Sequence, residues 1–216
     1  MVLARVRIAV VDDSVAIRIG FPHMLPALDV VAVHADVESF LVERPVVDAV
    51  ALDLKLAHDD GPARLNGLSA VRAVARAGYH ICLYTDERRR FVLAQCLRAG
   101  AHGVVHKSDP ADVVADALTL VAAGETVITQ SLVGLAELVE RRGGLPTVTQ
   151  RQREILAARA RGEPWASIAA RLFITEGVAR EHMTATTRKF AAYLADASPA
   201  DLERHLGLGP GDLIDG

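Results

Sequence analysis

The sequence predicts an α/β doubly wound domain on a five-stranded parallel sheet, joined to a second, smaller all-α helix-turn-helix domain. In the first 124 residues, short β-branched apolar runs alternate with segments of helical spacing, as a parallel sheet covered on both faces requires. After Gly124 only helical patterns follow. The expected strands are Val6–Val11, Val30–His34, Val46–Asp53, His80–Thr85 and Gly103–His106.

The helical segments between these strands place apolar residues three and four positions apart. Leu68, Val71 and Val74 form one such stripe, and a second stripe extends from Val113 to Val121. The second stripe begins after Ser108-Asp109-Pro110, which we interpret as a capping and first-turn signal.

The C-terminal part predicts helices at residues 131–142, 149–161, 164–172, 175–194 and 198–206. Thr149, Thr175 and Ser198 are the expected caps, and Pro164 is expected in a first turn. The short connection Phe173-Ile174-Thr175 between two of these helices predicts a helix-turn-helix, and Arg142-Gly143-Gly144-Leu145-Pro146 predicts a flexible linker. The predicted domains are residues 1–124, a connector helix and linker at 125–146, and the helix-turn-helix domain at 147–216.

Composition indicates a protein with a proper core, because 51% of residues are hydrophobic although only 4% are aromatic. The net charge of −3 is unevenly distributed. Residues 1–147 hold 15 Lys/Arg against 18 Asp/Glu, whereas residues 148–194 hold 8 against 4. This asymmetry favours a regulatory body attached to a nucleic-acid reader.

Cys82 and Cys96 lie in apolar runs and are predicted to be reduced core residues. The N-terminal residues enter a strand pattern directly and lack the layout of a signal peptide. No uncharged apolar stretch reaches the length that crosses a bilayer. We therefore expect a soluble cytoplasmic protein that does not bind membranes.

Polar side chains fall where the predicted strands end. Asp12 and Asp13 follow the first strand, Asp53 ends the third, Thr85 ends the fourth, and Lys107 follows the fifth. The carboxyl ends of parallel strands meet in one crevice. Crowded carboxylates repel one another unless a cation lies among them, and oxygen ligands suit Mg²⁺. A hydroxyl and an ammonium opposite them can hold a phosphoryl group.

This arrangement resembles the receiver domain of two-component systems, of flavodoxin-like fold, over roughly residues 5–123. The resemblance implies that Asp53 is phosphorylated by a sensor histidine kinase. It also implies that Mg²⁺ binds to Asp12, Asp13, Asp53 and the backbone carbonyl of Lys55. Thr85 is then the switch hydroxyl, and Lys107 pairs with the phosphoryl charge.

Two features depart from the receiver pattern. Val104 stands where the family often has an aromatic switch residue, three positions before the lysine. The loop after Asp53 contains an apparent insertion, Ala57 to Asn66, where the family has a short loop. This insertion is either a tolerated surface loop or a gate to the pocket, acting through His58, Asp59 and Asp60.

The predicted helix from Thr175 has two faces. A core stripe of Ala179, His182, Met183, Thr186 and Phe190 lies opposite a polar, partly cationic face. A helix that enters the major groove needs such a face. Arg180 is expected to reach guanine, Glu181 to accept from cytosine or to orient Arg180, and Thr184 to contact a thymine methyl or a phosphate. The predicted DNA-reading face is Gly177, Arg180, Glu181, Thr184, Arg188 and Lys189, with the last two directed to phosphates.

The segment from Val148 to Leu156, together with residues 168–176, His182 and Lys189, resembles the LuxR/NarL-type DNA-binding domain over roughly residues 147–206. Val178-Ala179 replaces the family's Thr-Val pair, so one backbone contact by a threonine is not expected.

The two resemblances together predict a response regulator that binds double-stranded DNA, is no enzyme, and forms a homodimer when phosphorylated. One alternative is an orphan regulator that ignores phosphate and is controlled by a ligand or by dimerisation. Another is a phosphatase of the haloacid dehalogenase type. That class needs an Asp-x-Asp at the first strand, whereas Asp12 and Asp13 are adjacent.

Overall fold

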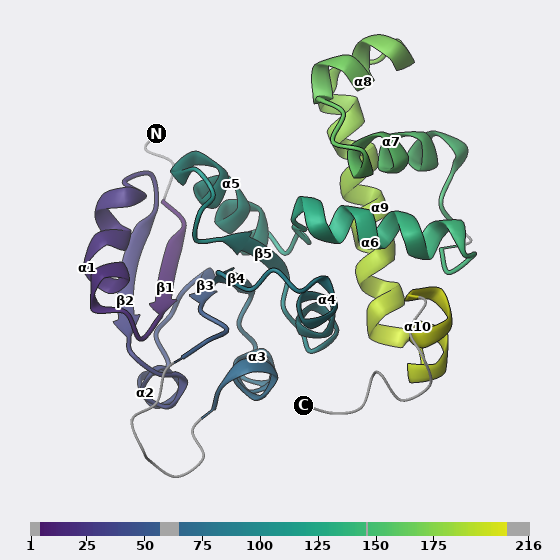
Figure 1. Cartoon of the computed structure of the whole chain (residues 1–216). Coiled ribbons are helices and arrows are strands. Elements are labelled where there is room, and N and C mark those ends of the chain that lie inside the picture. Colours follow the sequence, from purple (N-terminus) through teal and green to yellow (C-terminus); the bar gives the residue numbers. More distant parts are fainter. Residues whose placement is uncertain (1–4, 57–64, 146, 207–216) are drawn as a thin grey trace. The chain divides into compact units, whose positions relative to one another are not determined.

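The computed structural model describes residues 5–56, 65–145 and 147–206 (Figure 1). The chain divides into two compact units, Met1–Val127 and Ile128–Gly216. Among the described helices, none is long and apolar enough to cross a membrane.

The first unit contains a five-stranded parallel sheet with the strand order β2-β1-β3-β4-β5. Its strands are β1 (Arg7–Val11), β2 (Asp29–His34), β3 (Ala49–Leu52), β4 (Ile81–Thr85) and β5 (Gly103–His106). The predicted doubly wound class is therefore confirmed. The third strand is shorter at both ends than the apolar run predicted.

Burial along the strands explains why they could be predicted from apolar runs in the sequence. Every residue of the inner strands β3 and β4 is buried, because helices cover both faces of the sheet. The edge strand β2 instead alternates, with Val31 and Val33 exposed and Ala32 and His34 buried.

Helices cover the sheet in two layers (Figure 1). α1 (Val15–Met24) and α5 (Ala111–Ala122) pack on one face, where Phe21 and Leu118 join a core cluster with the strands. α2 (Val37–Glu43), α3 (Gly67–Arg76) and α4 (Arg90–Arg98) lie on the other face. α5 approaches β5 so closely that a Cβ on Gly103 would lie 2.7 Å from Val121 Cγ2.

The start of α5 differs from the prediction. Pro110 is the residue before the helix rather than part of its first turn, and no side chain caps the helix. The Asp109 carboxylate instead accepts a hydrogen bond from His106 N–H at 2.8 Å. This acidic side chain therefore closes the turn after β5 and does not cap the helix that follows.

Both cysteines are free and buried in the first unit, as the sequence predicts. Burial raises the pKa of the Cys82 thiol to about 12, and burial followed by the charge of Glu87 does the same for Cys96. Neither thiol is a reactive thiolate at neutral pH.

We expect the stability of the first unit to fall as the pH drops below about 6.5, the ordinary pKa of histidine. Burial, and then the neighbouring His80, lowers the pKa of His102, whose Nδ1 accepts a hydrogen bond from Ile81 N–H at 3.4 Å. Below this pH, His102 therefore takes up a proton more readily in the unfolded chain than in the folded chain. Urea unfolding between pH 5.0 and 7.5 measures this slope. His102→Gln should flatten it, and an unchanged slope in that variant would refute the assignment.

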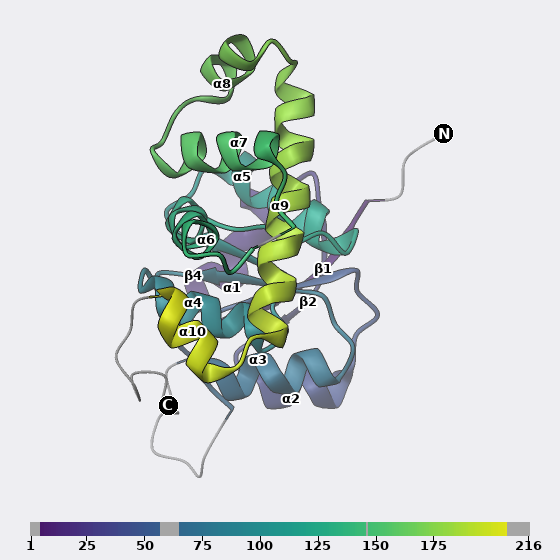
Figure 2. The same ribbon diagram turned by 90° about the vertical axis from the view of Figure 1, so that its right-hand side faces the viewer.

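The second unit is entirely helical in its described part. It contains α6 (Gln130–Arg141), α7 (Gln150–Ala160), α8 (Trp165–Leu172), α9 (Glu176–Asp196) and α10 (Pro199–Leu206). α7 and α8 both pack on the long helix α9, as Figure 2 shows. The helix-turn-helix prediction is confirmed in α8 and α9.

The predicted caps account for the helix starts. Thr149 forms a capping box with Gln152, and Thr175 Oγ1 accepts a hydrogen bond from Val178 N–H. Ser198 Oγ accepts from Asp201 N–H. Pro164 occupies the cap position of α8 instead of its first turn.

The segment between α6 and α7 is packed where the sequence predicts a flexible linker. Leu145 is only 3% exposed. A Cβ on Gly144 would lie 2.5 Å from Val139 Cγ1, so only glycine fits this approach to α6. α6 therefore belongs structurally with the helices that follow it.

We expect Phe173→Asn to stabilise the second unit by about 0.5 kcal/mol, because asparagine tolerates the left-handed conformation better than phenylalanine. Phe173 ends α8 at φ +55° and is 95% exposed, so its ring is not buried to offset the strain. Trp165 is the chain's single tryptophan, and its emission during urea unfolding reports this unit. Phe173→Ala is the control and should not stabilise, since it keeps the strain. Equal gains in both variants would contradict the explanation.

Candidate functional site

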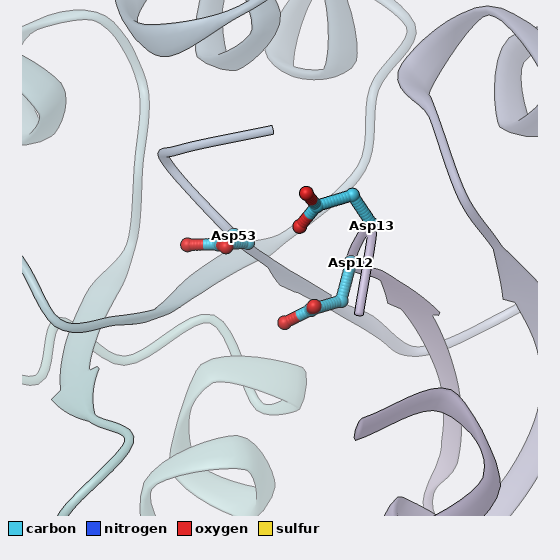
Figure 3. Close-up of side chains that lie close together, drawn as sticks. All are labelled: Asp12, Asp13 and Asp53. Atoms are coloured by element: carbon cyan, nitrogen blue, oxygen red, sulfur yellow. The ribbon is translucent and has the colours of Figure 1, made fainter. Parts of the chain in front are cut away.

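Three carboxylates meet at the carboxyl ends of β1 and β3. One oxygen from each of Asp12, Asp13 and Asp53 lies within 4.8 Å of the others. Figure 3 shows the three side chains turned toward a common region. The sequence-predicted acidic cluster is thus present. It forms because β1 and β3 are hydrogen-bonded neighbours that end at the same level, Val11 opposite Leu52.

Asp12 is the most enclosed of the three, at 1% exposure. Its backbone N–H donates to His34 O at 3.0 Å, and its Oδ1 accepts from Ser14 N–H at 2.9 Å. Burial raises the pKa of Asp12 despite the opposing influence of Lys107. The Arg18 guanidinium donates to the backbone oxygens of Asp12 and Asp13 and so fixes the loop that carries both carboxylates.

Lys107 bridges two of the carboxylates. Its Nζ lies 2.7 Å from Asp12 Oδ2 and 2.9 Å from Asp53 Oδ2. Burial lowers the lysine pKa, but the hydrogen bonds to Asp12 and Asp53 outweigh burial, so its pKa is raised overall. The ammonium therefore stays charged, as the prediction of a phosphoryl-binding lysine requires.

Asp53 holds the centre of the site and is 4% exposed. Its Oδ2 accepts from Lys107, and its Oδ1 accepts a hydrogen bond from Lys55 N–H at 3.2 Å. Its own backbone N–H donates to Val11 O at 2.8 Å, which fixes the end of β3 against β1. Each carboxylate oxygen of Asp53 thus has a hydrogen-bond donor, and the donor to Oδ2 is cationic.

Thr85 is fully buried at the end of β4. Its carbonyl accepts a hydrogen bond from Lys107 N–H at 3.1 Å, which places it beside the lysine. Its hydroxyl oxygen accepts from Glu87 N–H at 3.2 Å. In this structure the predicted switch hydroxyl is therefore hydrogen-bonded to the loop that follows β4.

Glu87 is a buried acid that the sequence analysis did not single out. It is 3% exposed. Hydrogen bonding by the Arg89 side chain lowers its pKa to about 2. Its Oε2 also lies 3.5 Å from Lys55 Nζ. The Lys55 side chain therefore faces Glu87, while its backbone N–H faces Asp53. The run of arginines after Glu87 gave the only available signal for this contact.

The donor set fits a divalent cation of the oxygen-binding kind. Three carboxylate oxygens are ligands that Mg²⁺ accepts together with water and phosphate oxygens. Nitrogen- and sulfur-seeking metals are disfavoured, because no histidine or cysteine joins this cluster among the described residues. The contribution of the Lys55 carbonyl remains a prediction.

The two departures from the receiver pattern have different outcomes. Val104 is fully buried in β5, and an aliphatic side chain thus fills the position where the family often has an aromatic one. Most of the insertion after Asp53, including His58, Asp59 and Asp60, lies outside the described residues. Its end is described. The Asn66 side chain accepts from Leu56 N–H and donates to Leu56 O, and it also begins α3.

The predicted DNA-reading face lies on α9 as expected. Gly177, Arg180, Glu181 and Arg188 are exposed, whereas Thr184 and Lys189 are partly buried. The opposite stripe packs inward, with Ala179, Met183, Thr186 and Phe190 buried and His182 partly buried. Lys189 Nζ donates to Thr147 O and to Gln152 Oε1, so this ammonium also ties α9 to the start of α7.

Arg180 has partners that the sequence analysis did not anticipate. Its guanidinium lies 3.4 Å from Glu176 Oε2, one turn earlier, rather than against Glu181. It also lies over the Trp165 ring, 4.9 Å from the centroid.

No protein-family model matches the chain. The response regulator RamR of Streptomyces coelicolor is 31% identical over 192 residues, which cover 87% of this chain and 90% of RamR. The nitrate/nitrite response regulator NarL of Escherichia coli is 28% identical over 193 residues, with 84% of this chain and 88% of NarL covered. A structure of the two-component response regulator RcsB in complex with DNA matches with a TM-score of 0.54 at 16% identity. It covers 94% of this chain and 98% of RcsB.

Proposed function

This chain belongs to the NarL/LuxR-type response regulators, and from that premise we propose that phosphorylation of Asp53 by a sensor histidine kinase controls its binding to DNA. The observation that carries the proposal is the enclosed acidic cluster with Lys107 bridging Asp12 and Asp53. Both relatives are response regulators, and we propose that this chain is likewise a regulator and no enzyme.

The proposed transfer is an in-line displacement at phosphorus. A carboxylate oxygen of Asp53 forms the new P–O bond, while the P–N bond to the kinase histidine breaks and the imidazole nitrogen leaves with the electron pair. Asp12 and Asp13, with Asp53 and the Lys55 carbonyl, would hold Mg²⁺, which supplies positive charge that lowers the repulsion between carboxylates and phosphoryl oxygens.

The protein's own groups then stabilise the product. The phosphoryl group carries nearly two negative charges where a carboxylate carried one. Lys107 already donates to Asp53 Oδ2 at 2.9 Å, so only a small movement directs its ammonium to a phosphoryl oxygen. Thr85 Oγ1 accepts from Glu87 N–H, so its O–H can donate to a phosphoryl oxygen, and the same hydroxyl would couple the pocket to the loop before α4.

The C-terminal unit is the proposed DNA reader. The proposed receiver is residues 1–124 and the proposed DNA-binding domain is 147–216, while α6, in the connection 125–146, belongs to the second compact unit. On α9, Arg180 and Glu181 would contact base edges, while Gly177 allows close approach, Thr184 reaches a methyl or phosphate, and Arg188 and Lys189 face phosphates. Two phosphorylated copies would read paired half-sites as a homodimer on double-stranded DNA in the cytoplasm.

The experiment is a selection of bound duplexes from a random library, with and without acetyl phosphate and Mg²⁺. We expect the phosphodonor to raise affinity for the selected duplex and to shift the protein toward dimer. Arg180→Ala should weaken binding to that duplex by about 1–3 kcal/mol. A protein that takes up phosphate but selects no duplex in either state would overturn the DNA half of the proposal.

One observation favours a second candidate function, control without phosphate. Buried Val104 replaces the aromatic that often reports the switch, so the usual coupling partner is missing from β5. In that case DNA binding would depend on a ligand or on dimerisation alone. Failure to incorporate phosphate, combined with intact selection of a duplex, would support this candidate.

A further inference from the structure

Trp165 is the first residue of α8 and brings two cations together. The guanidinium carbon of Arg159, on α7, lies 4.6 Å from the centroid of its ring, and that of Arg180, on α9, lies 4.9 Å away. Three separate helices thus meet at one partly buried indole. Each distance is within the range in which a guanidinium is attracted to an aromatic face.

Arg159 is the anchored member of this group. Its guanidinium donates to Glu163 O at 2.6 Å and to Gln130 Oε1 at 3.2 Å. Burial, and then the positive charge of Arg180, lowers its pKa from the ordinary value. The indole therefore contacts a cation that Gln130 of α6 and the Glu163 carbonyl in the loop before α8 hold in place.

Arg180 is the more exposed member, with 57% of its side chain accessible. The ring holds its guanidinium by the face, whereas base recognition uses the N–H groups at the edge. Stacking and guanine contact are therefore compatible. Glu176, at 3.4 Å, restrains the same group further.

We propose that Trp165 is a positioning residue for Arg180, whose guanidinium it holds against its ring face before DNA arrives, with N–H groups left to meet a guanine edge. An arginine loses about 2 kcal/mol of rotamer freedom when it is fixed. A side chain that is already ordered pays less of this cost on binding. The inference rests on the proposed DNA-binding function and adds a residue outside α9 to the reading machinery.

The first test uses fluorescence, because Trp165 is the only tryptophan. Arg180→Met should shift the emission of the full-length protein by removing a cation from the ring. Arg151→Met is the matched control, since Arg151 is a partly exposed arginine on α7 that pairs with Glu154. It should leave the emission unchanged. Equal spectra for the Arg180→Met variant and the wild type would overturn the stacking contact in solution.

The second test measures affinity for a duplex selected by the wild-type protein. Trp165→Leu should weaken binding roughly fivefold, which is the loss of affinity expected when one partly exposed cation–π contact is removed. Trp165→Phe should restore most of the loss. In an Arg180→Met background, Trp165→Leu should cause no further loss, whereas a structural defect in α8 would weaken both backgrounds equally.

These results distinguish a failure of the positioning role of Trp165 from a failure of the proposed DNA binding. A wild type that selects no duplex defeats the proposed function, and the reading role of Trp165 with it. A wild type that binds its duplex no better than Trp165→Leu overturns the positioning role alone. Equal losses from Trp165→Leu with and without Arg180 also overturn it.

Discussion

Asp53→Asn is expected to abolish phosphate incorporation from acetyl phosphate, because the amide cannot act as the nucleophile. The substitution keeps the shape of the side chain and leaves an oxygen for one of the two donors, Lys55 N–H and Lys107 Nζ. Loss of the 80-dalton mass increase in intact-protein spectra measures the effect. The phosphodonor-dependent change in dimerisation and DNA affinity should vanish with it.

Asp48→Asn is the matched control for this experiment. Asp48 lies immediately before the same strand and forms an ion pair with Arg7 at 3.1 Å, away from the acidic cluster. This variant should incorporate phosphate as the wild type does. Undiminished incorporation in Asp53→Asn would assign the phosphate to another side chain and remove the basis of the mechanism.

Lys107→Met is expected to lower the free energy of unfolding by about 2–3 kcal/mol at pH 7.5. Removal of one partner from a largely buried ion pair leaves its carboxylates unpaired, and the Lys107 side chain is 16% exposed, which moderates the cost. Asp12 already has a raised pKa from burial, so without the lysine it should protonate more readily. The destabilisation should therefore shrink as the pH falls toward 5, where a neutral carboxyl replaces a charged one.

The effect of Mg²⁺ on the melting temperature provides a second test of the Lys107→Met variant. The ammonium of Lys107 and a divalent cation compensate the same carboxylates, so Mg²⁺ should raise the melting temperature of Lys107→Met more than that of the wild type. Lys55→Met is the control, because the exposed Lys55 pairs with Glu87 at 3.5 Å and not with the cluster. If Lys107→Met melts like the wild type at every pH, the bridging geometry does not describe the protein in solution.

The sheet was predictable because its inner strands are buried on both faces and therefore appear in the sequence as unbroken apolar runs. The site followed from the sheet, since residues after neighbouring parallel strands meet at one edge. Asp12, Asp13, Asp53 and Lys107 could thus be grouped from sequence positions alone. Their predicted roles in metal and phosphoryl binding await the experiments above.

The contacts that escaped prediction depend on the directions of side chains, which the sequence pattern does not contain. Glu87 pairs with Arg89, two residues further along the chain, and with Lys55 from the loop after β3, and the run of arginines after it was the only hint of these contacts. The pairing of Arg180 with Glu176 was missed for a related reason. Glu176 and Glu181 both lie near Arg180 in sequence. Only Glu176 is four residues away, the spacing that puts two side chains on the same face of a helix.

The start of α5 was misjudged because Ser, Asp and Pro before a helix fit two arrangements. The carboxylate of Asp109 can either cap the helix or close the preceding turn. In the structure it accepts a hydrogen bond from His106 N–H and so closes the turn. Local hydrogen-bond competition of this kind is decided by backbone dihedral angles, which a one-dimensional pattern does not contain.

The pair of hydrogen bonds between Asn66 and Leu56 has a practical consequence for the chain between them. Because one amide joins the two ends, the distance that residues 57–65 must span is fixed independently of their number. Each doubling of such a closed segment costs only about 0.6 kcal/mol in chain entropy. If the insertion is the tolerated surface loop and not a gate, a peptide epitope can be inserted there as a handle for immobilisation, with Asp53 left in register.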